Sequence, residues 1–132
     1  MKICVTATAN SLDAQIDPRF GRCSYLVIAD SENMRFEAIL NMAAGVTGGA
    51  GIQAAQTIAS KGVTLLITGN VGPKAFGALS AAGIEIVTGA FGTVREAIEK
   101  FKRGEFKKTG SPTVGGHFGM GGKGGGRGVW RP

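Results

Sequence analysis

A T-G-x-x-G pattern occurs three times in this chain, each time between a segment with the pattern of a strand and one with the pattern of a helix. The copies begin at Thr47, Thr68 and Thr88, so they are 21 and 20 residues apart. Strands that alternate with helices pack as a sheet covered by helices, with short connections. The repeat therefore constrains the chain from about residue 47 onward to an α/β arrangement.

Hydrophobic periodicity predicts the remaining elements. Apolar, β-branched runs predict strands at residues 2–9, 24–29, 36–42, 63–68 and 84–88. Helical spacing predicts helices after Gly51, after Pro73 and after Thr93, where Thr93 and Glu96 form a capping-box pattern. The predicted order is β-β-β-α-β-α-β-α, which favours a mixed sheet with three helices packed on it.

The positive charge and much of the glycine are concentrated at the C-terminal end. The chain of 132 residues has a formal net charge of +6, yet residues 1–100 contain eight basic and eight acidic side chains. Residues 110–132 hold ten of the 23 glycines and few residues that could form a core. We therefore expect one domain at residues 1–109 and a flexible, basic, glycine-rich tail at residues 110–132.

Several classes of protein are disfavoured by patterns that the sequence lacks. It has neither an apolar run of 18 residues nor a signal-peptide pattern, and Cys4 and Cys23 do not form a disulfide-scaffold pattern. We expect a cytoplasmic protein with two thiols and no membrane partner. The common nucleotide fingerprints are absent and the one histidine, His117, lies in the tail, so a non-catalytic protein is favoured over an enzyme.

The glycine turns are the strongest candidate for a binding site. Glycine lets the backbone approach a ligand, and a helix start offers free N–H groups and a partial positive charge to an anion. If the strands before the turns run parallel, all three turns meet at the carboxyl ends of the strands, where α/β sheets place ligands. For a single turn, the geometry of a short strand-to-helix connection is the better explanation, but the recurrence at three corresponding positions favours an anion site. The candidate residues are Gly48, Gly49, Gly51, Gly69, Asn70, Gly72, Gly89 and Gly92.

The loop at residues 17–23 is expected to complete that site. Three helix starts contribute at most ~6 kcal/mol, less than the roughly 8 kcal/mol of micromolar binding, so a further contact is needed. Arg19 and Arg22 can donate to an anion, and we expect them to lower the pKa of the adjacent Cys23 toward a metal-binding thiolate. This predicts an anionic, thiophilic ligand, with Cys23 as a metal ligand and His117 as a further one if the tail folds over the site.

Three segments together resemble the dinitrogenase iron-molybdenum cofactor biosynthesis family. They are I-D-P-R-F-G-R-C-S-Y-L-V-I-A-D at residues 16–30, G-A-G-I-Q-A-A at 49–55 and L-L-I-T-G-N-V-G-P-K-A at 65–75. The resemblance covers about residues 1–106. It implies a ribonuclease H-like fold, with a five-stranded mixed sheet whose second strand is antiparallel and helices on both faces. It also implies a carrier or assembly protein for an iron-sulfur or molybdenum-iron-sulfur cluster, without turnover, and cluster donor or acceptor proteins as partners.

Two other functions stay open at this point. The basic tail, with Phe118 and Trp130, has the composition of a single-stranded nucleic-acid binder, although it holds one G-R-G and no array of them. Nucleic acid is therefore less favoured as a partner than a metallocluster. The glycine turns are also compatible with a regulatory module that binds a small anion.

Overall fold

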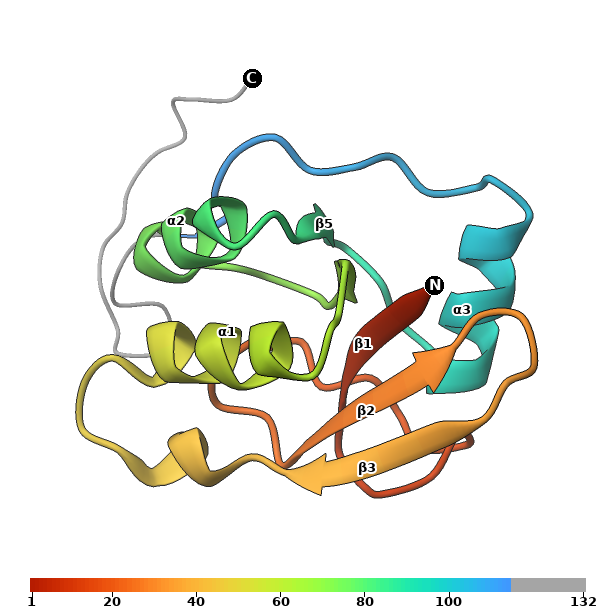
Figure 1. The fold of residues 1–132 in the computed structure, drawn as a ribbon, viewed down its shortest axis with the longest axis horizontal. Helices are drawn as coiled ribbons and strands as arrows, with labels where there is room; N and C mark the ends of the chain where they lie inside the picture. Colours follow the sequence, from red (N-terminus) through yellow and green to blue (C-terminus); the bar gives the residue numbers. More distant parts are fainter. Residues whose placement is uncertain (115–132) are drawn as a thin grey trace.

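The computed structural model describes residues 1–114 as one five-stranded mixed sheet with three α-helices (Figure 1). Its elements are β1 (Lys2–Ala7), β2 (Tyr25–Asp30), β3 (Phe36–Leu40), the 3-10 helix η1 (Met42–Gly45), α1 (Ala50–Ser60), β4 (Leu65–Ile67), α2 (Pro73–Ala81), β5 (Glu85–Val87) and α3 (Val94–Lys102). The strands lie in the order β3-β2-β1-β4-β5. β1, β4 and β5 are parallel, and β2 is antiparallel to β1 and β3. The predicted α/β class, element order and antiparallel second strand are confirmed.

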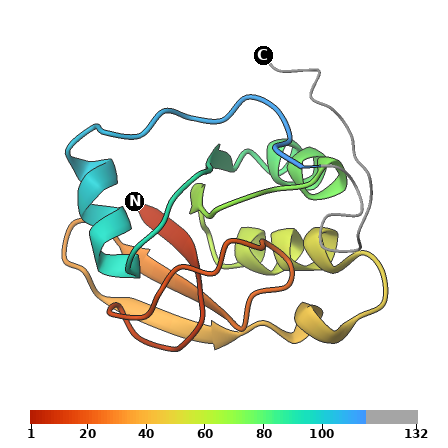
Figure 2. The same cartoon turned by 180° about the vertical axis from the view of Figure 1, so that it is seen from behind.

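Helices cover both faces of the sheet (Figures 1 and 2). Successive side chains of a strand point to opposite faces, so each buried strand contributes to two apolar layers. Leu26 and Leu66 pack with α1 and α2, whereas Val27 and Ile67 pack with α3. All four side chains are fully buried. Burial of each contributes roughly 1.5–3 kcal/mol to folding. The sheet thus separates α3 from the other two helices.

One end of the sheet, which we call the carboxyl rim, gathers the segments that precede the glycine turns. β1, β4 and β5 end there, and so does β3, since it is antiparallel to β2. β2 begins at this rim, so Cys23 lies there too. The turns at residues 47–51, 68–72 and 88–92 follow β3 with η1, β4 and β5 respectively. The expectation that these strands run in one direction and present the turns at one end of the sheet is confirmed.

Residues 105–114 form a strap that runs from the end of α3 across β5 to the start of α2 (Figure 1). The amide of Thr109 donates to the carbonyl of Ile86 at 2.6 Å. Farther along, the amide of Thr113 donates to the carbonyl of Val71, and the amide of Val71 donates to Thr113 Oγ1, both at 2.9 Å. The strap therefore closes the outer edge of β5 and reaches the second glycine turn.

The strap changes where the expected tail begins. The glycine and proline content of residues 110–114 predicts a flexible tail, yet Thr113 forms two hydrogen bonds with the backbone of Val71, one through its amide and one through its hydroxyl. The physical reason is that threonine hydroxyls can accept from turn amides, which composition alone does not reveal. Residues 115–132, including His117, lie outside the described residues, so a flexible tail there stays a prediction.

The described helices are short. α1 has 11 residues, and α2 and α3 have nine each. A helix that spans a bilayer needs about 20 apolar residues. Within residues 1–114, no helix meets that requirement of length and hydrophobicity.

Candidate functional site

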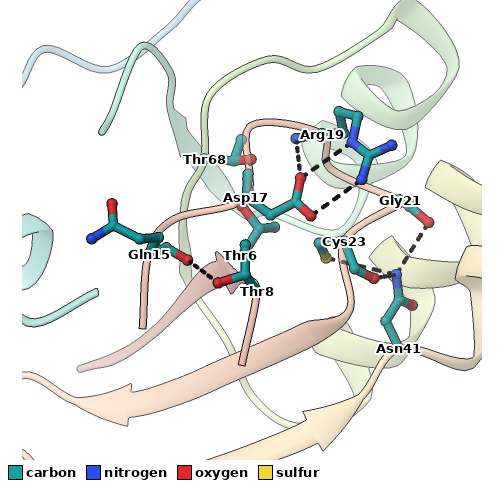
Figure 3. Close-up of polar contacts among 9 residues, drawn as sticks. All are labelled: Thr6, Thr8, Gln15, Asp17, Arg19, Gly21, Cys23, Asn41 and Thr68. Atoms are coloured by element: carbon teal, nitrogen blue, oxygen red, sulfur yellow. Dashed lines mark hydrogen bonds and ion pairs between the residues drawn. The ribbon is translucent and has the colours of Figure 1, made fainter. Parts of the chain in front are cut away.

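Two buried threonines hold the loop between β1 and β2 against the carboxyl rim (Figure 3). Thr6 lies near the carboxyl end of β1, and its Oγ1 donates to the carbonyl of Asp17 at 2.6 Å. Its hydroxyl also lies 2.7 Å from the hydroxyl of Thr68, which follows β4. The amide of Asp17 returns a hydrogen bond to the carbonyl of Thr6 at 2.9 Å. Because buried hydroxyls need partners, these bonds fix the loop across β1 and β4.

Asp17 and Arg19 form an ion pair at the start of the loop (Figure 3). The Asp17 carboxylate is buried and accepts from the Arg19 amide at 3.0 Å and from Arg19 Nε at 3.3 Å. The Arg19 side chain is about half exposed, at 53%. A buried carboxylate requires such a partner, so part of the Arg19 charge is used inside the protein. The backbone of Arg19 also forms a β-bridge with Asn70 in the second glycine turn.

Arg22 is tied to the segment that leads into α1. Its Nη1 donates to the carbonyls of Ala44 and Val46, at 3.0 and 2.6 Å. The side chain is otherwise exposed. Because these bonds use one nitrogen, the guanidinium keeps further donors for an anion, while its position is fixed beside the first glycine turn.

Small residues bring the loop between β1 and β2 into contact with the starts of α1 and α2. Gly21 has φ +97°, and a Cβ there would lie 2.9 Å from Gly51 Cα. A Cβ on Gly51 would in turn lie 2.7 Å from the Cβ of Ala75. Gly51 belongs to the first turn of α1 and Ala75 to that of α2, so the two helix starts touch directly. Gly69 likewise allows close approach of the loop, because a Cβ added at Gly69 would lie 2.6 Å from Pro18. Gly51 and Gly69 are thus needed for close packing.

The starts of α1 and α2 both lack the usual acidic or hydroxyl cap. The N-cap residues are Gly49 and Gly72, which carry no capping side chain, and neither first turn contains an acidic residue. Gly48 and Gly49 are exposed, and a Cβ on either would meet open space among the described residues. Lys74, exposed in the first turn of α2, adds a cation. Free amides, two helix dipoles and nearby cations together make this surface attractive to an anion.

The third glycine turn is built differently. Thr93 Oγ1 accepts from the Glu96 amide and the Glu96 carboxylate accepts from the Thr93 amide, so the predicted capping box is confirmed. A Cβ on Gly92 would lie 2.6 Å from Glu96 Oε1. A carboxylate therefore occupies the start of α3, which also packs on the opposite face of the sheet. The start of α3 therefore differs from the open helix start that we expected. The Gly89 amide still donates to the Gly69 carbonyl at 2.8 Å, so the third turn lies beside the second, and binding by Gly89 and Gly92 stays a prediction.

The chemistry of Cys23 differs from the sequence expectation. Its side chain is fully buried, and burial together with the charge of Asp17 raises the pKa of Cys23 to about 12 from 9.0. The Asn41 amide donates to the carbonyls of Cys23 and Gly21 and lies 3.7 Å from Cys23 Sγ. The prediction that Arg19 and Arg22 lower this pKa is wrong, because both guanidinium groups lie outside the apolar layer that surrounds the thiol.

Residues that sequence reasoning missed are buried polar groups and one lysine. Asn41, Asp17 and Thr6 are buried and hold the loop, and Lys74 lies at the start of α2. Asp17 had a sequence signal, because an aspartate two residues before Arg19 is typical of a turn in which its carboxylate accepts from the backbone. No group of three or more histidine, cysteine or acidic side chains that could hold a metal ion occurs in residues 1–114.

Comparisons with known proteins agree with this architecture. The family model described as dinitrogenase iron-molybdenum cofactor matches residues 1–104. The apo orange protein from Desulfovibrio gigas is 43% identical and superposes with a TM-score of 0.83, covering 85% of this chain and 95% of that one. A Thermotoga protein with a provisional NifB name, solved by NMR, is 34% identical with a TM-score of 0.71, covering 81% and 91%.

A sequence relative supports the same assignment. An uncharacterized protein of Methanocaldococcus jannaschii is 33% identical over 111 residues, which is 82% of this chain and 91% of that protein. The matched region contains the sheet, all three helices and the loop that bears Arg19 and Arg22. The chain therefore belongs to the dinitrogenase iron-molybdenum cofactor family.

Proposed function

We propose that this protein binds an anionic metal-sulfur cluster as cargo, without catalysing a reaction, at the surface formed by residues 48–51, 70–74 and the loop of Arg19 and Arg22. We call this surface the anion surface. The single observation that carries the proposal is the contact of two uncapped helix starts at Gly51 and Ala75, beside an arginine-bearing loop. Family membership supports an iron-sulfur or molybdenum-containing cargo.

Magnitudes favour a multiply charged anion. Two helix starts contribute at most ~4 kcal/mol together, which corresponds to about millimolar binding of a single charge. Arg19, Arg22 and Lys74 add exposed cations within the same surface. An anion with two or more negative charges and several acceptor atoms can contact both helix starts and the arginines at once. A metal-sulfur cluster has that charge and size, whereas a small monoanion uses only part of the surface.

In this proposal the cargo lies on the protein surface and does not contact the buried Cys23. Cys23 is buried with a raised pKa, so it is not the thiolate ligand of the proposed site. Backbone amides and guanidinium groups supply hydrogen bonds to sulfur or oxygen atoms on the surface of the cluster. Binding without a protein-metal bond permits release to an acceptor protein, as a carrier requires.

The direct test is reconstitution of the full chain. The protein is purified without oxygen and incubated with iron, sulfide and molybdate, and its metal and sulfide contents are then measured after gel filtration. We expect a stable metal-sulfur species with visible absorption. Failure to retain any metal or sulfide contradicts the proposal. Retention of molybdate without sulfide favours the regulatory anion-binding function instead.

A charge placed at the start of α1 tests the location. Gly48 has open space around it, so Gly48→Asp puts a carboxylate next to the free amides without a clash. We expect Gly48→Asp to reduce cargo retention about tenfold through repulsion and competition for the amides. The matched control is Gly48→Asn, which has the same shape and no charge. Equal retention by both variants removes the start of α1 from the site.

A further inference from the structure

The guanidinium of Arg22 has one side that is bound within the protein and one side that is free. Its Nη1 carries two hydrogens, and it donates to the carbonyls of Ala44 and Val46 at 3.0 and 2.6 Å. The other donors, Nε and Nη2, have no hydrogen-bond partner among residues 1–114, and the residue is exposed. Nε and Nη2 lie on the same side of the planar group, so together they match two adjacent acceptor atoms of one anion.

Arg19 uses that same side of its guanidinium inside the protein. Its Nε donates to Asp17 Oδ1 at 3.3 Å and its Nη2 to Asp17 Oδ2 at 3.4 Å. The two-donor side of Arg19 is therefore occupied by a buried carboxylate, and Nη1 is the nitrogen that is left for an external anion. The two arginines of the loop are thus not equivalent, because Arg22 alone keeps its two-donor side open.

Asn41 fixes both ends of the Arg22 side chain. Its Nδ2 donates to the carbonyls of Gly21 and Cys23, the residues on either side of Arg22, at 3.1 and 2.9 Å. Its Oδ1 accepts from the amide of Ala43 at 3.2 Å and so caps η1, which leads to the two carbonyls that hold Nη1. Asn41 is buried, so one rigidly held amide connects the backbone of the loop to the segment that orients the guanidinium.

These contacts assign different roles to Arg22 and Asn41. Resting on the proposed function, we propose that Arg22 recognises the cargo by donating from Nε and Nη2 to two adjacent oxygen or sulfur atoms of a multiply charged metal-sulfur anion, and that Asn41 is its positioning residue. The bidentate contact between Asp17 and Arg19 shows the same pattern with an internal carboxylate. An arginine that is oriented before binding loses less side-chain freedom when the anion arrives.

The first test separates the hydrogen-bond pattern of Arg22 from its charge. Arg22→Lys keeps the positive charge but replaces the two-donor side by a single ammonium group. The control is Arg35→Lys, the same exchange at an exposed residue before β3, at the end of the sheet away from the carboxyl rim. The probe is thiomolybdate prepared from molybdate and sulfide, and bound molybdenum is measured by equilibrium dialysis with the full chain. We expect Arg22→Lys to bind about tenfold more weakly than the wild type, and Arg35→Lys to stay within about twofold of it.

A double-mutant cycle tests whether Asn41 acts through Arg22. Asn41→Ala should weaken thiomolybdate binding about fivefold in the wild-type background and by less than about twofold in the Arg22→Gln background, because the group that it positions is then absent. A residue that served folding alone would weaken binding equally in both backgrounds. The control is Asn33→Ala, since Asn33 Oδ1 likewise accepts from a backbone amide, that of Arg35, in the turn between β2 and β3. It should leave binding unchanged, and circular dichroism shows whether each variant is folded.

The outcomes separate this inference from the proposed function. If the wild type does not bind thiomolybdate, both proposals fail. If the wild type and Arg22→Lys bind it equally, the anion surface stands and the two-donor contact is refuted. If Asn41→Ala lowers the affinity by the same factor in both backgrounds, the positioning role of Asn41 is refuted. Arg22→Lys retains Asn41, so it tests the two-donor contact even where an Asn41 variant does not fold.

Discussion

The thiol of Cys23 lies beneath the carboxyl rim, with the amide of Asn41 as its polar neighbour. A residue that directly follows Arg22 in the sequence thus faces the protein interior, while the Arg19 and Arg22 side chains are exposed. The sequence could place Cys23 at the rim, because it directly precedes the second strand. It could not predict the direction of the side chain, since that depends on the packing of α1 over the loop.

Cargo retention should not depend on this thiol. We expect Cys23→Ser to keep the wild-type content of metal and sulfide after reconstitution, because the thiol is buried and protonated at neutral pH. The measurement is metal per chain after gel filtration, with circular dichroism to show that the variant is folded. A folded Cys23→Ser protein without cargo would return the thiol to the ligand set.

Stability at alkaline pH should depend on Cys23. An unfolded chain releases the thiol proton near pH 9.0, whereas burial raises the pKa in the folded protein to about 12. The folded state therefore holds more protons between these values, and the free energy of unfolding falls as the pH rises from 9.0 to about 12. Urea denaturation at about pH 8 and about pH 10 should show a smaller loss for Cys23→Ala than for the wild type. An equal loss in both proteins argues against a buried, protonated thiol.

The three glycine turns share a sequence pattern, but the helices that follow them differ at their N-termini: α3 has a side-chain cap, whereas α1 and α2 have none. The capping box at Thr93 and Glu96 was predictable from spacing, and it is the feature that closes the start of α3. Its consequence for the site was hidden, because the repeat is defined by glycines and threonines alone. Gly51 and Gly69 likewise occupy expected positions, but contacts with Ala75 and Pro18 explain why glycine is needed there.

The contact between the two helix starts gives a prediction about stability and binding together. Gly51→Ala places a methyl group 2.7 Å from Ala75 Cβ, so we expect a loss of about 1–3 kcal/mol in the free energy of unfolding and weaker cargo retention. Adding Ala75→Gly should restore retention by reopening the space. Gly77→Ala is the control, because it lies exposed in α2 with open space and should gain about 0.5–1 kcal/mol. Denaturant titration distinguishes the three cases.

For the whole molecule, the periodic pattern was sufficient to predict the class, the order of the elements and the common rim of the turns. The element order fixes which strands need crossover helices, and this leaves few ways to assemble the sheet. The strap was not predictable, because Thr109 and Thr113 lie in a segment without periodicity. Their partners, at Val71, Ile86 and Thr88, come together only in the folded chain.

Truncation separates the strap from the residues beyond it. We expect a chain ending at Val114 to keep the free energy of unfolding of the full chain. A chain ending at Lys108 should lose about 1–3 kcal/mol, because the amides of Val71 and Thr88 lose their acceptors. Thermal denaturation of both proteins decides this. Equal stability of the two truncated chains contradicts a structural strap.

The position of the strap also sets an order of events during synthesis. Val71 and Thr88 emerge from the ribosome before the threonines that pair with them, and at ~5–20 residues per second the delay amounts to a few seconds. During this interval the second and third turns have incomplete hydrogen bonding. The second and third turns of the nascent protein therefore gain these hydrogen bonds only after the strap has been synthesised.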